Sequence, residues 1–320
     1  MEIRHATSED LPAVIELLKA SLGEGMIQKS LNLWKWKHID NPHGASPVLI
    51  AVENGVIAGV RAFLKWQWQF KGKTYEAVRA VDTATHPDFQ GKGIFKKLTL
   101  QGLEDVKQAG VKFVYNTPNE NSKPGYLKMG WVEQGRMPLK LKVNPTSYGN
   151  TAEPQAPEQE WERLQDLLPT LRNPVSESGA VHTKLSPAYI NWRYRDNPLF
   201  PYYFITDYRS YLLFYRIKKH KFGQEMRVVD VFTNSDKLEI AALKNLKQAF
   251  KQIANKCFLV SASGRHYSLV KKVYFSMGML PVVAKGPIVT LRNLQMSEES
   301  FADLRAVNNW AYSLGDMELF

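Results

Sequence analysis

The stretch that decides the fold runs from Val81 to Leu98 and reads VDTATHPDFQGKGIFKKL. Its first residues, up to Thr85, are mostly short or β-branched and predict the end of a strand. Pro87 ends that strand, because proline has no amide hydrogen to donate to a sheet. Two glycines follow, and apolar residues then recur at helical spacing from Phe95 onward. The stretch therefore predicts a strand, a glycine-rich turn and a helix, in that order.

The glycine-rich turn is a candidate anion site. The first amides of a helix have no intrahelical partner, and the helix dipole adds partial positive charge there. Gly91 and Gly93 let a phosphate approach the backbone, since neither carries a Cβ atom. Lys92 adds a positive charge beside them. An ordinary strand-to-helix turn with a solvated lysine face is the alternative interpretation.

The turn resembles the pyrophosphate loop of the GNAT superfamily of N-acetyltransferases, whose signature is Gln/Arg-x-x-Gly-x-Gly/Ala. Gln90 and Gly93 match it, and Phe95 stands where Gly or Ala is expected. The resemblance implies that the loop holds the pyrophosphate of acetyl-coenzyme A, the acetyl donor. The coenzyme contacts implied in this way fall on Ala84, Thr85, Gln90, Gly91, Lys92, Gly93, Ile94, Phe95 and Asn121.

A second segment, Tyr126–Trp131, resembles the family's Tyr-x-x-x-Gly-Phe signature, which follows an asparagine-containing segment. In the family this tyrosine lies near the thioester sulfur and acts as a general acid. A phenol suits the protonation of a leaving thiolate, so the resemblance implies that Tyr126 is the acid. Packing of its ring under a short helix is the alternative. The candidate bases for the acceptor amine are Glu76, Asp82, His86 and Glu120.

Composition limits the class of protein. The 320 residues allow two domains, and 44% of them are hydrophobic, which is enough for substantial cores. No apolar run is long enough for a transmembrane helix, and the N-terminus lacks the apolar region of a signal peptide. Cys257 is the only cysteine, which excludes an intrachain disulfide and a cysteine-rich metal site. We expect a cytoplasmic protein that needs no metal.

The net charge of +11 indicates an anionic partner. The lysines are spread along the chain and no nucleic-acid-binding motif is visible, so an anionic cofactor accounts for the charge better than nucleic acid does. We expect no membrane partner either.

Hydrophobic periodicity predicts the elements on either side of the loop. Before it we expect a strand at Ile3–Ala6, a helix at Leu11–Leu22 and three antiparallel strands at Val48–Glu53, Val56–Phe70 and Thr74–Thr85. Asn54-Gly55 marks a hairpin turn between the first two of these three. Four tryptophans in this half belong either to the core or to the wall of an acceptor pocket: Trp34, Trp36, Trp66 and Trp68.

The second half of the chain repeats segments of the first, which predicts a tandem duplication. In chain order the matching pairs are Trp36–Pro42 with Trp192–Pro198, Arg79–Asp88 with Arg227–Asp236, and Tyr126–Trp131 with Tyr274–Met279. The glycine loop is not repeated: Leu238–Ala241 stands in its place, and the Glu239 carboxylate competes with phosphate at a helix N-terminus. We therefore predict that the second copy does not bind coenzyme A.

The repeat also bears on Asp82 as a base. Its counterpart Asp230 persists where the loop is lost, which favours a structural role, with Asp82 paired to Arg79 and Asp230 to Arg227. Tyr274 likewise persists opposite Tyr126, so part of the role of Tyr126 is packing.

These inferences predict an α+β protein of two tandem GNAT-like domains, each with a mixed, mostly antiparallel sheet flanked by helices. The predicted limits are a catalytic domain at 1–145, a linker at 146–160, a degenerate domain at 161–296, and a C-terminal helix and tail at 297–320.

The predicted function is acetyl transfer from acetyl-CoA to a primary amine of a small molecule or peptide by direct attack. The catalytic candidates are Tyr126, Asp82 and Glu76. A coenzyme-binding or sensing protein without turnover, and an aminoacyl-tRNA-dependent transferase of similar tandem fold, are the alternatives. In some multidomain relatives the terminal carboxylate reaches the active site, a role that would fall on Phe320 here.

Overall fold

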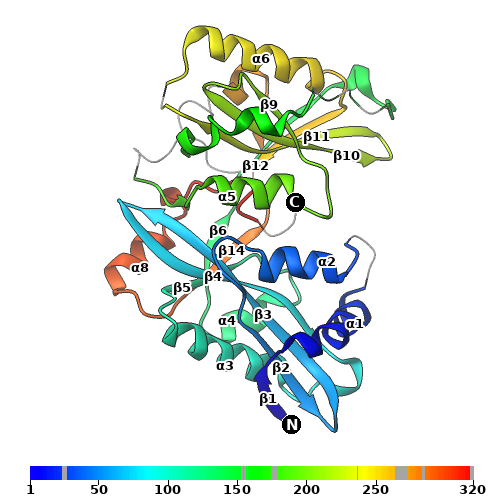
Figure 1. Cartoon of the computed structure of the whole chain (residues 1–320), viewed down its shortest axis with the longest axis vertical. Coiled ribbons are helices and arrows are strands. Elements are labelled where there is room, and N and C mark those ends of the chain that lie inside the picture. The colour runs from blue at the N-terminus through cyan, green and yellow to red at the C-terminus, as the bar shows by residue number, and fades with distance from the viewer. Residues whose placement is uncertain are drawn as a thin grey trace.

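The protein is built from two mixed β-sheets, one above the other, with helices on their outer faces and between them (Figure 1). This arrangement comes from a computed structural model that describes residues 1–23, 27–152, 154, 156, 158–173, 179–235, 237–263, 273–282 and 285–317. The predicted α+β class with two mixed sheets is confirmed. In the described part of the chain, no helix has both the length and the apolar character needed to cross a membrane.

The first sheet contains the strands predicted around the glycine loop. Its order is β1 (Glu2–His5), β2 (Val48–Glu53), β3 (Val56–Phe70), β4 (Lys73–Thr85), β5 (Phe113–Asn116), β14 (Ile288–Asn293) and β6 (Val132–Arg136), with β8 (His182–Thr183) also paired to β3. Strands β1 to β4 pair with one another in antiparallel fashion, whereas β4 pairs with β5 in parallel. Alternating apolar residues and the Asn54-Gly55 turn fixed the limits of β2 and β3, which match the prediction.

The second sheet repeats the central part of the first. Its order is β13 (Leu280–Val282), β7 (Leu139–Val143), β12 (Leu259–Ser263), β11 (Gly223–Thr233), β10 (Tyr211–His220) and β9 (Tyr203–Thr206). Strands β9 to β11 are antiparallel and β11 pairs with β12 in parallel, as β4 pairs with β5.

The two sheets exchange a strand. β7 precedes the predicted domain limit at residue 145 but pairs in the second sheet, and β14 lies in the predicted second domain but pairs between β5 and β6 of the first sheet. Sheet membership therefore changes more than once along the chain, and the predicted domain limits stay a proposal.

The helices cover the sheets and join them. They are α1 (Leu11–Leu22), α2 (Leu31–Trp34), α3 (Ile94–Gln108), α4 (Lys123–Lys128), α5 (Pro187–Ile190), α6 (Ile240–Ala254) and α8 (Glu298–Arg305). α3 packs on one face of the first sheet and α6 on the outer face of the second (Figure 1). The opposite face of the first sheet carries Trp66 and Trp68, which belong to one large core shared with the second half. The two halves therefore form a single packed unit.

The duplication is visible at the junction of the halves. α2 and α5 each begin after a serine N-cap, Ser30 and Ser186, whose side chain accepts a hydrogen bond from the amide three residues on. Each helix continues as a π-helical turn, Lys35–Ile39 and Asn191–Arg195. Trp36 and Trp192 stack, and each indole nitrogen donates to the other's main-chain oxygen at 2.7 Å. This reciprocal contact confirms that the Trp-containing segments are equivalent.

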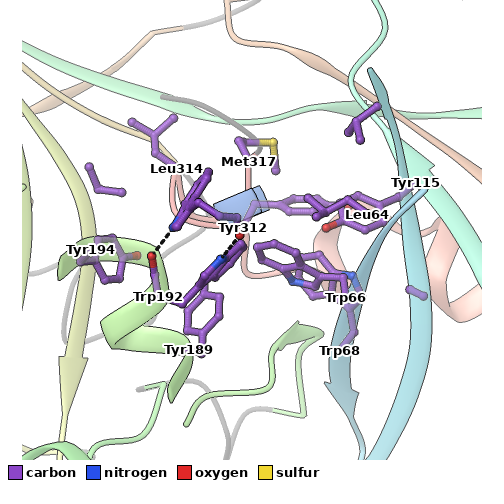
Figure 2. Packing of buried hydrophobic residues seen from close by; sticks show 14 of the residues in the cluster. Leu64, Trp66, Trp68, Tyr115, Tyr189, Trp192, Tyr194, Tyr312, Leu314 and Met317 are labelled. Carbon is purple, nitrogen blue, oxygen red and sulfur yellow. Dashed lines mark hydrogen bonds between the residues drawn. The ribbon is translucent and has the colours of Figure 1, made fainter. Parts of the chain in front are cut away.

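A C-terminal segment, residues 310–317, is buried between the two halves. Figure 2 shows Tyr312, Leu314 and Met317 among the tryptophans of β3 and the aromatic residues around α5. Gly315 lies so close to Asp230 and Tyr194 that a Cβ atom there would overlap both side chains, so only glycine fits. The segment therefore seals the space between the sheets.

Asp316 of the buried segment and Asp230 of β11 form an acidic pair that makes stability depend on pH. Burial raises the pKa of Asp230 to about 7 and that of Asp316 to about 6, and the Asp316 carboxylate further disfavours ionisation of Asp230. Tyr194 donates to Asp230, Thr183 and the Ser313 amide donate to Asp316, and the Arg193 guanidinium lies nearby. A carboxyl group whose pKa is higher in the folded than in the unfolded protein contributes to the free energy of unfolding as long as it is protonated. This contribution is complete below the pKa of the unfolded chain and is lost as pH rises through the folded-state pKa of about 7.

We therefore expect the free energy of unfolding to fall between about pH 4 and pH 7, by about 1.4 kcal/mol for each unit of pKa shift. Asp230→Asn mimics the protonated form, so its unfolding free energy should change less over the same range. Urea unfolding of both proteins at pH 5 and pH 8 measures the difference. Equal pH dependence in the two proteins would contradict the assignment.

Candidate active site

A β-bulge shapes the centre of the candidate site. The pairing of β3 with β4 shifts so that Arg61 on β3 faces both Asp82 and Thr83 on β4. Asp82 has a φ of +41°, a conformation uncommon for a residue with a side chain. Bulges redirect side chains and are frequent beside active sites. This bulge lies directly before Ala84 and Thr85, which lead into the glycine loop.

Asp82 is bound by two residues of the π-helical turn that follows α2. Its Oδ2 accepts hydrogen bonds from Lys37 Nζ at 2.5 Å and from His38 Nε2 at 2.8 Å. Burial alone would raise the pKa of Asp82, but the charge of Lys37 and the hydrogen bond from His38 outweigh it and hold the pKa well below its usual range. Asp82 is therefore an ionised carboxylate in a largely dry environment.

These contacts correct the predicted ion pairs. Asp82 pairs with Lys37 and not with Arg79, and Asp230 is bound by Tyr194 while Arg227 pairs with Glu225. Lys37-His38 and Arg193-Tyr194 occupy equivalent places in the two π-helical turns. The repeat thus conserves a contact from the π-helical turn to the strand aspartate, with histidine in one copy and tyrosine in the other.

A cleft opens where β4 and β5 diverge. The parallel pairing holds only from Ala77 to Arg79, after which β4 has no neighbour on its β5 side. The resulting cavity has a volume of about 400 Å³ and its walls include Ala84, Thr85, Phe95 and Tyr126. Main-chain groups of β4 beyond Arg79 therefore face the cleft. There they can form hydrogen bonds with a ligand that lies where a neighbouring strand would otherwise pair.

The glycine loop lies at the end of β4, before α3. Gly91 and Gly93 have φ values of +78° and +73°, which favour glycine, and a Cβ atom at either position would meet open space. The amides of residues 91–96 donate no hydrogen bond within the described part of the chain. Unpartnered amides at the start of a fifteen-residue helix fit a bound pyrophosphate. Lys92, whose Nζ lies 3.8 Å from Glu53 Oε1, is exposed beside them.

Tyr126 lies in the cleft with its hydroxyl bound to a cation. It is 5% exposed and lies in α4, and its Oη accepts a hydrogen bond from Arg61 Nη1 at 2.8 Å. The Phe95 ring packs edge-on against the Tyr126 ring, with centroids 5.5 Å apart. The departure from the family signature at Phe95 therefore places an aromatic side chain beside Tyr126 and leaves the loop amides accessible.

A second cavity joins the cleft from the side of α1 and α2. Its volume is about 320 Å³, and its apolar wall includes Ile15, Leu18, Leu33 and Trp34. Four residues line both cavities: Leu22, Arg79, Asp82 and Thr117. The two cavities therefore meet at the bulge, and a ligand in each would bring its reactive end to the same place.

Arg79 is a buried cation at this meeting point. It is 3% exposed, and its Nη2 donates to Thr117 Oγ1 at 2.6 Å. Its guanidinium carbon lies 5.4 Å from the centre of the Tyr115 ring, and Nη1 makes long contacts to the Asp316 main-chain oxygen and to Met317 Sδ, at 3.4 and 3.5 Å. Its Nε has no hydrogen-bond partner in the described part of the chain. Arg79 is thus available to an anionic group of a ligand.

The remaining predicted site residues lie elsewhere. Glu76 accepts a hydrogen bond from Gln67 near the start of β4 and lines neither cavity, and Asn121 and Glu120 are exposed. His86 accepts a bond from the Asp88 amide in the turn after β4. Of the four base candidates, the structure places only Asp82 on the two cavities.

Of the four tryptophans, Trp34 lines the apolar cavity and the other three belong to the core. Phe320 lies outside the described residues.

The sequence analysis missed Lys37, His38 and Arg61. Lys37 and His38 lie inside the segment repeated at Arg193 and Tyr194, and the recurrence of a polar pair directly after the repeated tryptophan was a usable signal. Arg61 stands alone among apolar residues of a long strand, a pattern that favours a functional or structural reason for burial.

Known proteins share this fold and its motifs. Residues 2–133 match the acetyltransferase (GNAT) domain family. L-amino acid N-acyltransferase MnaT of Escherichia coli K12 is 28% identical over 147 residues, which are 43% of this chain and 83% of that protein.

Two solved structures each extend the likeness to 92% of this chain. One is a probable N-acyltransferase of Enterococcus faecalis, with a TM-score of 0.65, 12% identity and 72% of its own chain covered. The other is Eis1 of Mycobacterium abscessus, with a TM-score of 0.57, 13% identity and 74% covered. The N-terminal part of the chain, residues 2–133, therefore carries a GNAT acetyltransferase domain, and the chain as a whole shares the fold of these two structures. Members of this family use an acyl-coenzyme A as acyl donor.

We predict that one coenzyme binds per chain. The first half has the orphaned loop amides, whereas α6 of the second half begins behind exposed Glu239, whose charge opposes a phosphate. Isothermal titration calorimetry with coenzyme A should give a stoichiometry of one. Two equivalent sites would show that the second half has kept a coenzyme site.

Proposed function

We propose that this protein transfers the acetyl group of acetyl-CoA to the primary amine of a small acceptor, and that the acceptor is an amino acid with an apolar side chain. The observation that carries the proposal is the meeting of the cleft and the apolar cavity at Asp82 and Arg79. The similarity to an L-amino acid N-acyltransferase supports the acceptor class. The predicted domain limits, a catalytic domain at 1–145 and a degenerate one at 161–296, remain part of this proposal.

The coenzyme would bind along the cleft. The amides at the start of α3 would hold its pyrophosphate, and Lys92 would add charge beside it. Its pantetheine arm would lie along the free side of β4, where main-chain amides around Ala84 polarise the thioester carbonyl. This placement brings the sulfur to the wall of the cleft formed by Phe95 and Tyr126.

The acceptor would occupy the apolar cavity. Its side chain would contact Ile15, Leu33 and Trp34, and its carboxylate would pair with Arg79. Its ammonium group would then face Asp82. A carboxylate with so low a pKa is a weak base, so Asp82 orients the amine while a water molecule takes the proton.

The reaction would proceed by direct attack. The amine nitrogen forms a bond to the thioester carbon, and the carbon–sulfur bond then breaks with its electron pair passing to sulfur. Tyr126 donates its proton to the thiolate and regains one, through water, from the nitrogen that has become bonded to the acyl carbon, while the proton first taken from the ammonium passes to solvent. No metal ion takes part in this scheme.

An acceptor panel tests the proposal. Thiol release from acetyl-CoA is measured with L-methionine, L-leucine and L-phenylalanine, with their methyl esters, and with the matching amines that lack the carboxyl group. We expect turnover with the free amino acids. Coenzyme binding without thiol release in any of these reactions would favour a non-catalytic binding protein, and salt-sensitive binding of charged tRNA would favour the transferase alternative.

Replacing Arg79 tests the assigned carboxylate contact. Arg79→Met should raise KM for a free amino acid about 10- to 100-fold, because a hydrogen bond to a charged group contributes about 1.5–3 kcal/mol. KM for the methyl ester should change little. Arg216→Met is the matched control, since Arg216 is a largely buried arginine of the second half that lies over Phe200. An equal increase in KM for the free amino acid and for its methyl ester would show that Arg79 does not bind the carboxylate.

A further inference from the structure

Arg61 is a buried cation directly behind the reacting groups. It lies on β3 opposite the bulge and its side chain is 0% exposed. Nη1 donates to Tyr126 Oη at 2.8 Å and also to Thr83 Oγ1. Both acceptors are neutral, and both residues line the coenzyme cleft. Arg61 thus contacts the cleft through two hydroxyl groups.

The charge of Arg61 has no anionic partner. It takes part in no ion pair within the described part of the chain, and its Nε and Nη2 donate no hydrogen bond there. The rings of Phe63, Phe95 and Tyr126 lie 5.0, 5.6 and 5.3 Å from its guanidinium carbon. Aromatic faces attract a cation but compensate burial only partly. A buried charge without a counter-charge is costly, so its retention calls for a negative charge at some stage of function.

The polarity of the contact with Tyr126 is fixed. A guanidinium can only donate, so the Tyr126 oxygen must accept and its own proton is free to be donated elsewhere. The rings of Phe95 and Trp131 hold the Tyr126 ring on two sides, at centroid distances of 5.5 and 5.0 Å. The hydroxyl is therefore held in place, and its proton has no hydrogen-bond acceptor among the residues that the structure describes.

We propose that Arg61 is a positioning residue for acyl transfer, which orients the Tyr126 hydroxyl toward the coenzyme sulfur and stabilises the negative charge that develops there. The inference rests on the proposed function. When the carbon–sulfur bond breaks, its electron pair goes to sulfur, the Tyr126 proton moves to that sulfur, and the negative charge passes to the phenol oxygen. Arg61 Nη1 already donates to this oxygen, so the stabilisation needs no rearrangement.

A double-mutant cycle on the full chain tests the proposal. Arg61→Met should lower kcat with acetyl-CoA about 100-fold while leaving the affinity for coenzyme A nearly unchanged. Arg61→Lys, which keeps the charge, should recover part of the loss. In a Tyr126→Phe background, Arg61→Met should cost little more, because the group through which Arg61 acts is already absent.

The acyl donor supplies a second readout. S-phenyl thioacetate releases a more acidic thiol that needs less help from an acid, so the loss in kcat/KM caused by Arg61→Met should be much smaller with it. A purely structural role would lower turnover equally with both donors and in both backgrounds, and that result would overturn the proposal. If wild-type protein binds coenzyme but acetylates no amine, the proposed function itself fails, whatever Arg61 does.

If Arg61→Met does not fold, the same measurements of turnover, with both donors and in both backgrounds, can be made with Arg61→Lys and Arg61→Gln. Full activity in Arg61→Gln would equally overturn the proposal, because glutamine keeps a hydrogen-bond donor but no charge. Coenzyme A affinity by calorimetry confirms that each variant is folded at the site.

Discussion

Tyr126→Phe should lower kcat for acetyl transfer by about 10²- to 10⁴-fold, the usual contribution of a general acid. The substitution removes only the hydroxyl, which is the single group of this side chain that can give a proton to the leaving thiolate. The ring contacts with Phe95 and Trp131 remain, so the cleft keeps its shape. Steady-state kinetics with acetyl-CoA and a reactive amino acid measures the loss.

Coenzyme binding separates this role from packing. Because Tyr126 lines the end of the cleft and not the pyrophosphate loop, calorimetry should give nearly the same affinity for coenzyme A as wild type. Tyr274→Phe is the matched control, since Tyr274 is the buried counterpart of Tyr126 in the second half. Unchanged turnover in Tyr126→Phe would remove this residue from the mechanism.

Asp82→Ala should destabilise the fold by about 3–5 kcal/mol, because it leaves a buried charge without its partner. Lys37 and His38 are 3% and 2% exposed, and both donate to the Asp82 carboxylate. Removal of the carboxylate takes away the counter-charge that lies 2.5 Å from the buried Lys37 ammonium. Urea unfolding followed by tryptophan fluorescence measures the difference in unfolding free energy.

The same variant should lose acetyl transfer, since the acceptor amine loses the carboxylate that orients it. Asp88→Ala is the control, because Asp88 lies in the exposed turn before the glycine loop and its side chain is 82% exposed. Its unfolding free energy should stay within about 0.5 kcal/mol of wild type. Wild-type stability in Asp82→Ala would show that Lys37 is compensated by another group.

The sequence was sufficient for the elements around the glycine loop. Alternation and turn residues set the limits of β2 and β3, and helical spacing between a capping segment and Gly23 set those of α1. These signals are local, because each depends on residues that are neighbours in the chain. The glycine loop and Tyr126 were likewise found because short motifs carry them.

Contacts between segments that are distant in the sequence could not be predicted from such local signals. The pattern of β14 indicates a strand but not that it pairs between β5 and β6, more than 150 residues earlier. The predicted pairing of Asp82 with Arg79 failed because the bulge turns Asp82 toward a π-helical turn 44 residues away in sequence. The repeat showed that both the tryptophan segment and the aspartate segment occur twice, but it did not show that they contact each other.

A crystal structure of the full chain with bound coenzyme A tests the central claim most directly. We predict one coenzyme in the first half, with its pyrophosphate on the amides of residues 91–96 and its sulfur within hydrogen-bond distance of the Tyr126 hydroxyl. The apolar cavity beside α1 should open toward the thiol. A coenzyme bound in the second half, or a sulfur remote from Tyr126 and Asp82, would contradict this account.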